Sequence, residues 1–266
     1  MPVSPPFSRS LKIALAGLAF YFALMGWLPL AAALGNQPPG WVTGVAFWGL
    51  MTFTIGHAVH TWGGPRALAF LAWAGGVTWT FEVLGVHTGW PFGAYVYTSP
   101  HLRPKVLGVP VFVPLVWAVM AYPAWHLAHR AFPRGPRWLK TLMAAWALTS
   151  WDLLADPLLV NVGQWRWLSS GAYFGIPVQN YLGWLLTASV VFAGWGWPAM
   201  RADGDVWPWL AYAGIAVLYV VLTWQAGLHG AALAGGLATG AVALWSLPHF
   251  WPFQVGPYHP SNEVKT

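Results

Sequence analysis

The chain reads Trp151-Asp152-Leu-Leu-Ala-Asp156-Pro157 at the start of the stretch around which its fold is organised. This stretch continues through Gln164-Trp165-Arg166-Trp167 and ends as Gly171-Ala-Tyr173-Phe174-Gly175-Ile-Pro177-Val-Gln-Asn180-Tyr181-Leu-Gly183. Asp152 and Asp156 are four residues apart in an apolar run, so a helix places both on one face, about 6 Å apart along its axis. A carboxyl group inside a membrane segment is costly, and it therefore marks a candidate functional site.

Composition places the whole chain in a membrane. Of its 266 residues, 58% are hydrophobic and 7% are charged, whereas a soluble domain carries about a quarter charged residues. We expect a single integral membrane domain over residues 1–266, with a catalytic core at about 67–200. The absence of cysteine excludes disulfides, thiolate nucleophiles and cysteine-based metal sites. The net charge of +6 does not indicate nucleic-acid binding, because the basic residues lie at segment ends.

Hydrophobic runs of about 20 residues predict an all-α, polytopic transmembrane helical bundle with about eight spans. The expected spans are 11–34, 41–60, 67–86, 106–130, 139–161, 176–199, 206–225 and 228–250. Only a tight turn near Gly227 separates the last two, which leaves seven spans as an alternative.

The distribution of basic residues predicts a cell-membrane protein with both termini on the cytoplasmic side. With the N-terminus inside, the outer side carries only Arg103, Lys105 and Arg166. The cytoplasmic ends carry Arg9, Lys12, Arg66, Arg130, Arg134, Arg137, Lys140, Arg201 and Lys265.

This topology brings three acids together. Glu82 lies about 15 residues from the cytoplasmic start of its span, and Asp152 lies about 13 residues from the start of its own. Both are therefore about 20 Å from the cytoplasmic ends of these helices, in the outer half of the bilayer. The outer loops 87–105 and 162–175 lie over the same half, and with the adjoining residues they bring His87, Tyr95, Tyr97, Gln164, Tyr173 and Asn180 to one rim. The other acids, Asp203, Asp205 and Glu263, are expected to be solvated.

Structural explanations for the three acids remain open. Arg166 or Arg103 could neutralise one of them, and Asp156 could cap a segment restarted at Pro157. Three acids with few nearby bases also favour at least one neutral carboxyl group, which can donate a proton. The 22 tryptophans are explained either by packing against lipid and neighbouring helices or by an aromatic-walled cavity.

Two histidine pairs form a competing site. His57-Ala-Val-His60 and His126-Leu-Ala-His129 both have the i, i+3 spacing that can bind a metal. Membrane di-iron enzymes need denser histidine clusters, and no carboxylate accompanies these pairs in the sequence. We therefore expect partly hydrated interfacial histidines and predict no metal site.

Several blocks in order carry a family resemblance. They are Glu82, Gly89-Trp90-Pro91-Phe92-Gly93-Ala-Tyr95-Val-Tyr97, Pro104-Lys105-Val-Leu-Gly108-Val-Pro110 and the stretch from Trp151 to Trp184. Over about residues 80–185 the chain resembles the carotenoid hydratase family, which includes bacterial carotenoid 1,2-hydratases and haloarchaeal bisanhydrobacterioruberin hydratase.

The resemblance implies addition of water to the terminal double bond of an acyclic carotenoid end, which gives a tertiary alcohol. The implied substrates are lycopene, γ-carotene or a C50 precursor, and the partners are this lipid-soluble substrate, water and membrane lipid. No cofactor is expected, because the reaction involves no redox change.

Chemistry suggests roles for the candidate residues. Asp152 is the first choice for the acid and Glu82 the second, while Asp156 either orients the acid or takes a proton from water. The aromatic rings of Trp90, Phe92, Tyr95, Trp151 and Trp184 could stabilise a carbocation, and Asn180, Tyr173 or Gln164 could position water. Tyr97 completes the set of predicted substrate-binding residues.

Two other classes remain open. A proton-coupled transporter also uses buried acids, although this sequence has no detectable inverted repeat. The other class is a membrane protein that binds carotenoid without changing it chemically. The choice of carotenoid, the number of ends that react and the oligomeric state are left open.

Overall fold

The computed structural model describes residues 8–197 and 205–247, and in these ranges the chain is helical apart from four short strands. The helices are α1 Arg9–Ala33, α2 Trp41–Trp62, α3 Gly64–Thr88, α4 Phe112–Ala131, α5 Arg137–Thr149, α6 Asp152–Asn161, α7 Val178–Trp195, α8 Trp207–Gln225 and α9 His229–Ser246. The strands are β1 Tyr95–Tyr97, β2 Lys105–Val106, β3 Val109–Pro110 and β4 Trp165–Trp167. The predicted all-α architecture is confirmed. Arg201, Asp203, Glu263 and Lys265 lie outside the described residues.

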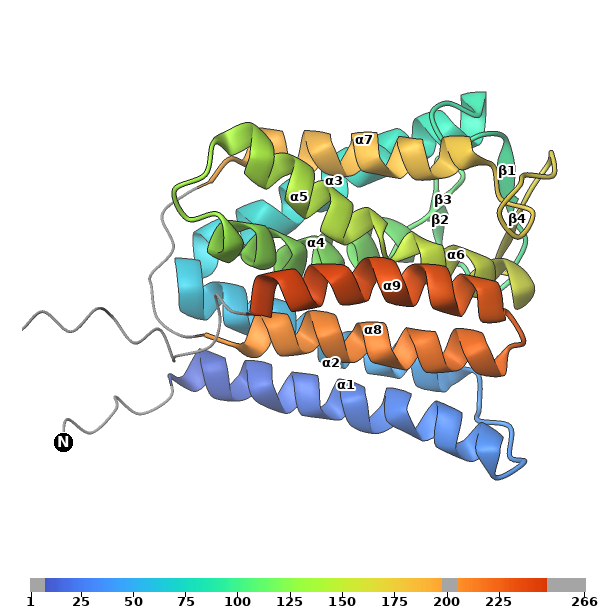
Figure 1. The fold of residues 1–266 in the computed structure, drawn as a ribbon, viewed down its shortest axis with the longest axis horizontal. Coiled ribbons are helices and arrows are strands. Elements are labelled where there is room, and N and C mark those ends of the chain that lie inside the picture. Colours follow the sequence, from blue (N-terminus) through green and yellow to red (C-terminus); the bar gives the residue numbers. More distant parts are fainter. Residues whose placement is uncertain (1–7, 198–204, 248–266) are drawn as a thin grey trace, which may run out of the picture.

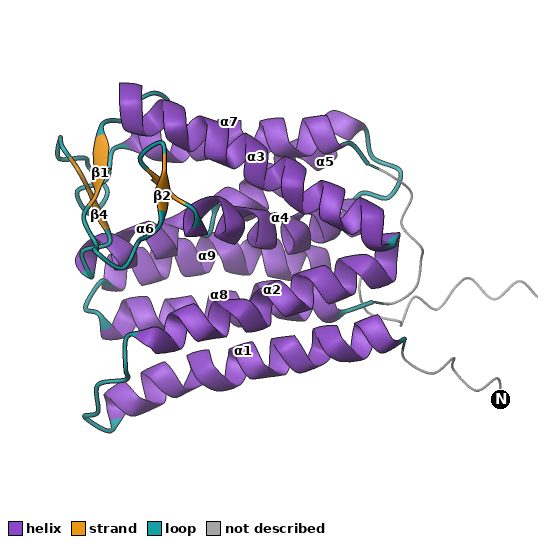
Figure 2. Ribbon diagram, turned by 180° about the vertical axis from the view of Figure 1, so that it is seen from behind, coloured by secondary structure: helices purple, strands orange, loops and turns teal. Residues whose placement is uncertain are grey.

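The helices lie side by side with their axes along the long dimension of the molecule (Figure 1). Within the described residues, α1, α2, α3 and α8 are each long and apolar enough to cross a membrane. The strands gather at one end of the bundle, and the start of α1 lies at the other (Figures 1 and 2). Gly227 has a positive φ of 77° and separates α8 from α9 as two distinct helices.

The predicted fifth segment, 139–161, is two helices rather than one. The break falls at Ser150 and Trp151, where the Ser150 Oγ donates to the carbonyl of Ala147 at 2.9 Å and lies 3.0 Å from the Tyr212 hydroxyl. α5 packs along α7, whereas α6 packs against α8 and α9. The break therefore redirects the chain and makes Asp152 the first residue of a new helix.

Asp156 does not cap a restarted segment, because α6 begins four residues earlier and continues through Pro157. Proline has no backbone N–H, so the carbonyl of Leu153, four residues before it, loses its helical partner. The Tyr173 hydroxyl donates to this carbonyl at 2.9 Å. A side chain from the loop before α7 thus satisfies a polar group that an apolar interior could not leave unpaired.

The predicted start of the fourth span, residue 106, was also wrong. Residues 105–110 form the β2–β3 hairpin, in which Leu107 and Gly108 both have positive φ, and α4 begins only at Phe112. Positive φ at both central residues is the geometry of a tight two-residue hairpin turn. The run of apolar residues therefore includes a turn that a hydropathy window does not resolve.

Glycines allow α1 and α2 to pack closely. A Cβ atom at Gly49 would lie 2.8 Å from the carbonyl oxygen of Gly17, and one at Gly17 would lie 2.6 Å from that of Gly49. Small residues at such crossings are the usual device by which membrane helices approach each other.

We predict that Gly49→Ala lowers the thermal stability of the purified protein, because the new methyl group forces the two backbones apart at a cost of about 1–3 kcal/mol. The matched control is Gly44→Ala in the same helix, where an added Cβ meets nothing within 4 Å. This control should leave stability unchanged or raise it by up to about 1 kcal/mol, through helix propensity. Equal melting temperatures for the two variants, measured by unfolding in detergent, would contradict the close α1–α2 contact.

Candidate active site

Glu82 is buried in α3 and is held by two phenols. Its side chain is 2% exposed, and its Oε2 accepts hydrogen bonds from the hydroxyls of Tyr95 and Tyr97. Because successive strand residues alternate in direction, Tyr95 and Tyr97 in β1 project from the same face toward the acid. Burial, and after it the neighbouring Glu82 carboxyl, raises the pKa of both phenols above the ordinary value. Both hydroxyls therefore remain donors at neutral pH.

A two-stranded sheet fixes these tyrosines. β1 pairs antiparallel with β4, with Tyr95 opposite Trp167 and Tyr97 opposite Trp165. The indole N–H of Trp167 also donates to the carbonyl of Phe92 at 3.0 Å. The two loops expected to meet over one rim are thus joined by backbone hydrogen bonds.

Asp156 also has a polar partner. It is 5% exposed, and its Oδ2 accepts a hydrogen bond of 2.6 Å from the amide of Asn180, which is buried in the first turn of α7. The helix α7 approaches this region closely because residue 183 is glycine. A Cβ atom there would lie 2.7 Å from the ring of Phe92 and 2.9 Å from the carbonyl oxygen of Pro91.

Asp152 differs from the other two acids. It is 8% exposed, and its Oδ2 makes no hydrogen bond within the described residues. The carboxyl groups of Asp156 and Glu82 lie close enough to act on it electrostatically. The three acids selected from the sequence therefore interact electrostatically, and among the described residues the Asp152 Oδ2 has no hydrogen-bond partner.

The selected aromatic residues divide into two groups. Phe92, Tyr95, Tyr97 and Trp184 lie together, with the rings of Phe92 and Trp184 4.3 Å apart. Trp184 also stacks on Trp117 at 3.8 Å, a partner from α4 that the site prediction did not include. The other two lie outside this group. Trp90 is 51% exposed and stacks on Phe81, whereas Trp151 is buried against Tyr212 and Tyr219 of α8.

The remaining water-positioning candidates have other contacts. The hydroxyl of Tyr173 is committed to Leu153, and burial raises its pKa to about 12. Gln164 is half-buried, and its backbone carbonyl accepts from the N–H groups of Thr98 and Ser99. Sequence reasoning missed Tyr181, whose buried hydroxyl makes no hydrogen bond in the described part of the chain.

The two arginines that could have neutralised an acid form no ion pair with a described residue. Arg103 and Arg166 are both exposed. Arg166 lies at the middle of β4, between two tryptophans that project from the opposite face. Ion pairing with these arginines therefore does not explain the buried acids.

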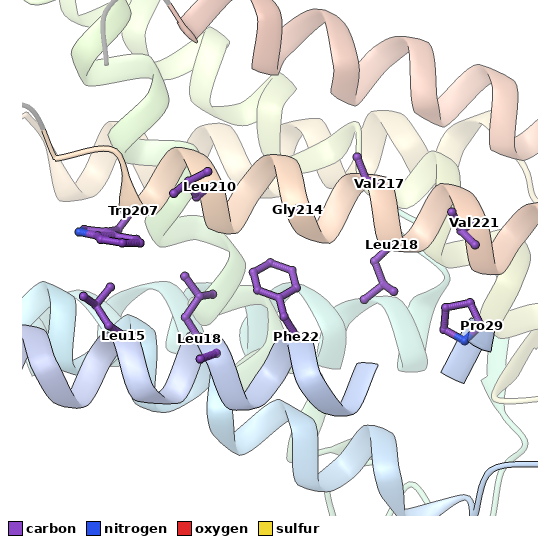
Figure 3. A pocket seen from close by; sticks show the side chains of 11 residues that line it. Leu15, Leu18, Phe22, Pro29, Trp207, Leu210, Gly214, Val217, Leu218 and Val221 are labelled. Carbon is purple, nitrogen blue, oxygen red and sulfur yellow. The ribbon is translucent and has the colours of Figure 1, made fainter. Parts of the chain in front are cut away.

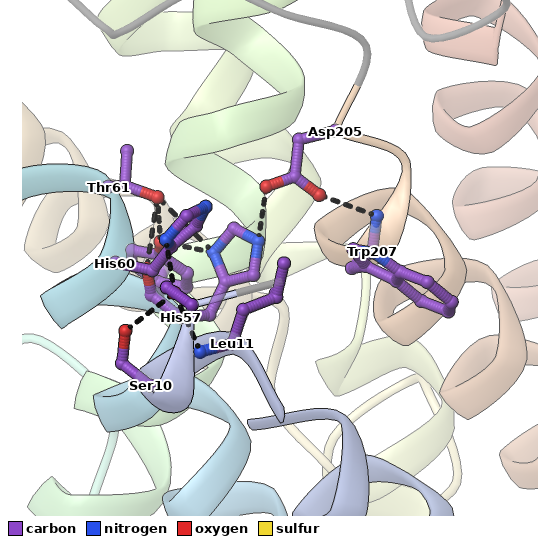
Figure 4. A network of polar contacts seen from close by, with 9 residues as sticks. Ser10, Leu11, His57, His60, Thr61, Asp205 and Trp207 are labelled. Carbon is purple, nitrogen blue, oxygen red and sulfur yellow. Dashed lines mark hydrogen bonds and ion pairs between the residues drawn. The ribbon is translucent and has the colours of Figure 1, made fainter. Parts of the chain in front are cut away.

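The histidines form a separate cluster near the other end of the bundle, and two expectations about it were wrong. His57 is fully buried rather than partly hydrated, with its Nδ1 2.7 Å from the Tyr122 hydroxyl. Asp205 is paired rather than freely solvated, with its Oδ2 2.6 Å from the His57 Nε2 (Figure 4). Burial acts to raise the pKa of Asp205, but His57 and the backbone N–H of Trp207 outweigh it and hold that pKa below its usual value. No group of three or more potential ligands among the described residues is arranged to hold a metal ion.

A separate apolar groove of about 810 Å³ lies between α1 and α8 (Figure 3). Phe22 and Leu18 from α1 face Leu210 and Leu218 from α8 across it. Its lining carries no titratable side chain, so it offers no acid–base chemistry of its own.

Comparison with known proteins identifies relatives of this chain. It is 38% identical over 115 residues to a bisanhydrobacterioruberin hydratase from Haloarcula japonica, an alignment that covers 41% of this chain and 38% of that protein. The chain therefore matches less than half the length of this curated relative. No solved structure matches. Residues 40–243 match the carotenoid biosynthesis protein family, and because this match spans most of the chain, the protein belongs to that family.

Proposed function

We propose that the protein is a membrane hydratase of carotenoid biosynthesis, which adds water to the terminal double bond of an acyclic carotenoid end. The observation that carries the proposal is the Asp152 carboxyl, which is buried, interacts electrostatically with two further acids and has an oxygen without a hydrogen-bond partner in the described part of the chain. The family and the hydratase relative support the same reaction class. Lycopene, γ-carotene and a C50 precursor carry the required end group.

The reaction begins with proton transfer from a neutral Asp152 carboxyl to the CH carbon of the terminal alkene. The electron pair of the double bond forms the new C–H bond, and the adjacent carbon becomes a tertiary carbocation. The oxygen of water then forms a bond to this carbon, and the extra proton of the adduct returns to the Asp152 carboxylate. The net change is addition of one water, without oxidant, reductant or cofactor.

The hydrogen bonds distinguish Asp152 from its neighbours. Glu82 accepts from two phenols, and Asp156 accepts from Asn180, so both are held in fixed positions. Donors that bind a carboxyl group favour its charged form, which makes these two acids suited to stabilising a cation rather than to donating a proton. Asp152 has the free oxygen and the low-dielectric surroundings that a proton donor needs.

Location fits the two reactants. The β1–β4 sheet, which supplies Tyr95 and Tyr97 to Glu82, lies at the end of the bundle opposite the start of α1 (Figure 1). If both termini lie on the cytoplasmic side of the cell membrane, as the basic residues predict, this end lies in the outer leaflet. A carotenoid dissolved in lipid and water from the outer surface can both reach it.

Expression in a lycopene-producing host should yield pigments that are heavier by one water per modified end. Mass spectrometry of extracted pigments, compared with the host alone, measures this change. Unchanged pigment that copurifies with the protein would instead favour a carotenoid-binding protein.

The oxygen source provides an independent check on the chemistry. Heavy-oxygen water should label the new hydroxyl group, and labelled molecular oxygen should not. Label from molecular oxygen would contradict hydration and point to an oxygenase.

Asp152→Asn should reduce hydration by at least about a hundredfold, because general acid catalysis typically contributes 10²–10⁴ in rate. The substitution preserves side-chain volume, so stability and expression should change little. The matched control is Asp205→Asn, which alters an acid near the opposite end of the bundle and should retain turnover in the folded protein. Full activity of Asp152→Asn would exclude it as the acid and shift the assignment to Glu82, for which Glu82→Gln is the corresponding variant.

A further inference from the structure

Tyr181 carries a polar group that the proposed chemistry has not yet used. It lies in the first turn of α7, and its hydroxyl oxygen is buried without a hydrogen-bond partner in the described residues. Buried phenols usually find such a partner, because leaving the hydroxyl unpaired costs free energy. This hydroxyl therefore indicates a site for a small polar molecule.

Neighbouring contacts place Tyr181 against the first turn of α6. Its ring meets the ring of Tyr173 edge-on at 5.4 Å, and the Tyr173 hydroxyl donates to the carbonyl of Leu153, the residue after Asp152. The residue before it, Asn180, donates to Asp156. Both contacts hold the start of α7 and its preceding loop against residues 152–156.

The Oδ2 of Asp152 is the second unpaired polar atom at this turn. The ring contact with Tyr173, which donates to Leu153, and the bond from Asn180 to Asp156 place Tyr181 beside this turn. An ordered buried water needs two to four polar partners. Tyr181 and Asp152 supply two such partners, whereas the hydroxyl of Tyr173 already donates to Leu153 and one N–H of Asn180 to Asp156.

We infer that Tyr181 and Asp152 together bind the water that adds to the carbocation, an inference that rests on the proposed hydratase function. The Tyr181 hydroxyl donates a hydrogen bond to one lone pair of the water and leaves the other lone pair to form the C–O bond. Once that bond forms, the proton lost from the water oxygen passes to the Asp152 carboxylate, which regenerates the acid. Tyr181 is thus a positioning residue for water, and it takes no part in protonating the alkene.

Tyr181→Phe removes the hydroxyl group and keeps the ring. In D₂O, an unhydrated cation loses a proton and returns deuterium-labelled alkene, so alkene exchange reports protonation and alcohol formation reports water capture. We expect Tyr181→Phe to lower hydration by about tenfold, the rate effect of one hydrogen bond, and to raise the ratio of exchange to hydration by a similar factor. Tyr181→His, which restores a donor at this position, should recover part of the lost hydration.

Tyr122→Phe is the matched control, because it removes a buried hydroxyl that contacts His57 near the other end of the bundle. Its exchange-to-hydration ratio should equal that of the unmodified protein. The ratio does not depend on how much of the sample is folded, so a loss of stability alone cannot imitate the effect.

An exchange-to-hydration ratio for Tyr181→Phe equal to that of Tyr122→Phe would overturn the inference. Where exchange and hydration have both fallen by the same factor, this unchanged ratio would place Tyr181 in the protonation step. Failure of the hydratase proposal itself looks different, because the unmodified protein would then form neither alcohol nor deuterated alkene.

Discussion

The cost of keeping three carboxyl groups in a low-dielectric interior governs the architecture of this protein. A carboxyl group removed from water needs hydrogen-bond donors or a neutral state. The β1–β4 sheet, the only strand pairing between distant loops in the described residues, supplies Tyr95 and Tyr97 to Glu82. The first turn of α7 supplies Asn180 to Asp156. The features that depart from a plain helical bundle therefore serve the acids.

The same requirement accounts for the broken fifth segment. A continuous helix through Ser150 would carry the chain onward along α7, but the break turns α6 toward α8 and α9. Asp152 then stands as the first residue of α6. Pro157 removes one backbone hydrogen bond of α6, and the Tyr173 hydroxyl donates to the carbonyl of Leu153 in its place. The side chain of Tyr173 thus links the loop before α7 to α6.

Hydrophobic run lengths predicted the helices apart from the break at Ser150 and Trp151 and the later start of α4. Helix depth predicted that Glu82 and Asp152 lie at the same level, because the two segments were expected to run in the same direction. The pairing of β1 with β4 was not predicted, since three-residue strands carry little pattern, although Trp165-Arg166-Trp167 does alternate apolar and polar residues. Asp205 was misjudged because its partner, His57, is distant in sequence. Tyr181 was overlooked because a phenol in an apolar helix gives no local sign that its hydroxyl is unpaired.

The surface of α7 has an exposed apolar face and a buried face that carries polar groups. Val178, Leu182 and Leu186 form an exposed apolar stripe at four-residue intervals, while Asn180, Gly183 and Trp184 face the interior. Tyr181 lies between these faces and is half-buried, with its hydroxyl end covered. In the proposed reaction, a polyene moving in the lipid along this stripe brings its terminal double bond to the boundary that Tyr181 occupies. The proposed acid and the inferred water would lie behind that boundary, so in this proposal the alkene inserts only its end group between the polar side chains.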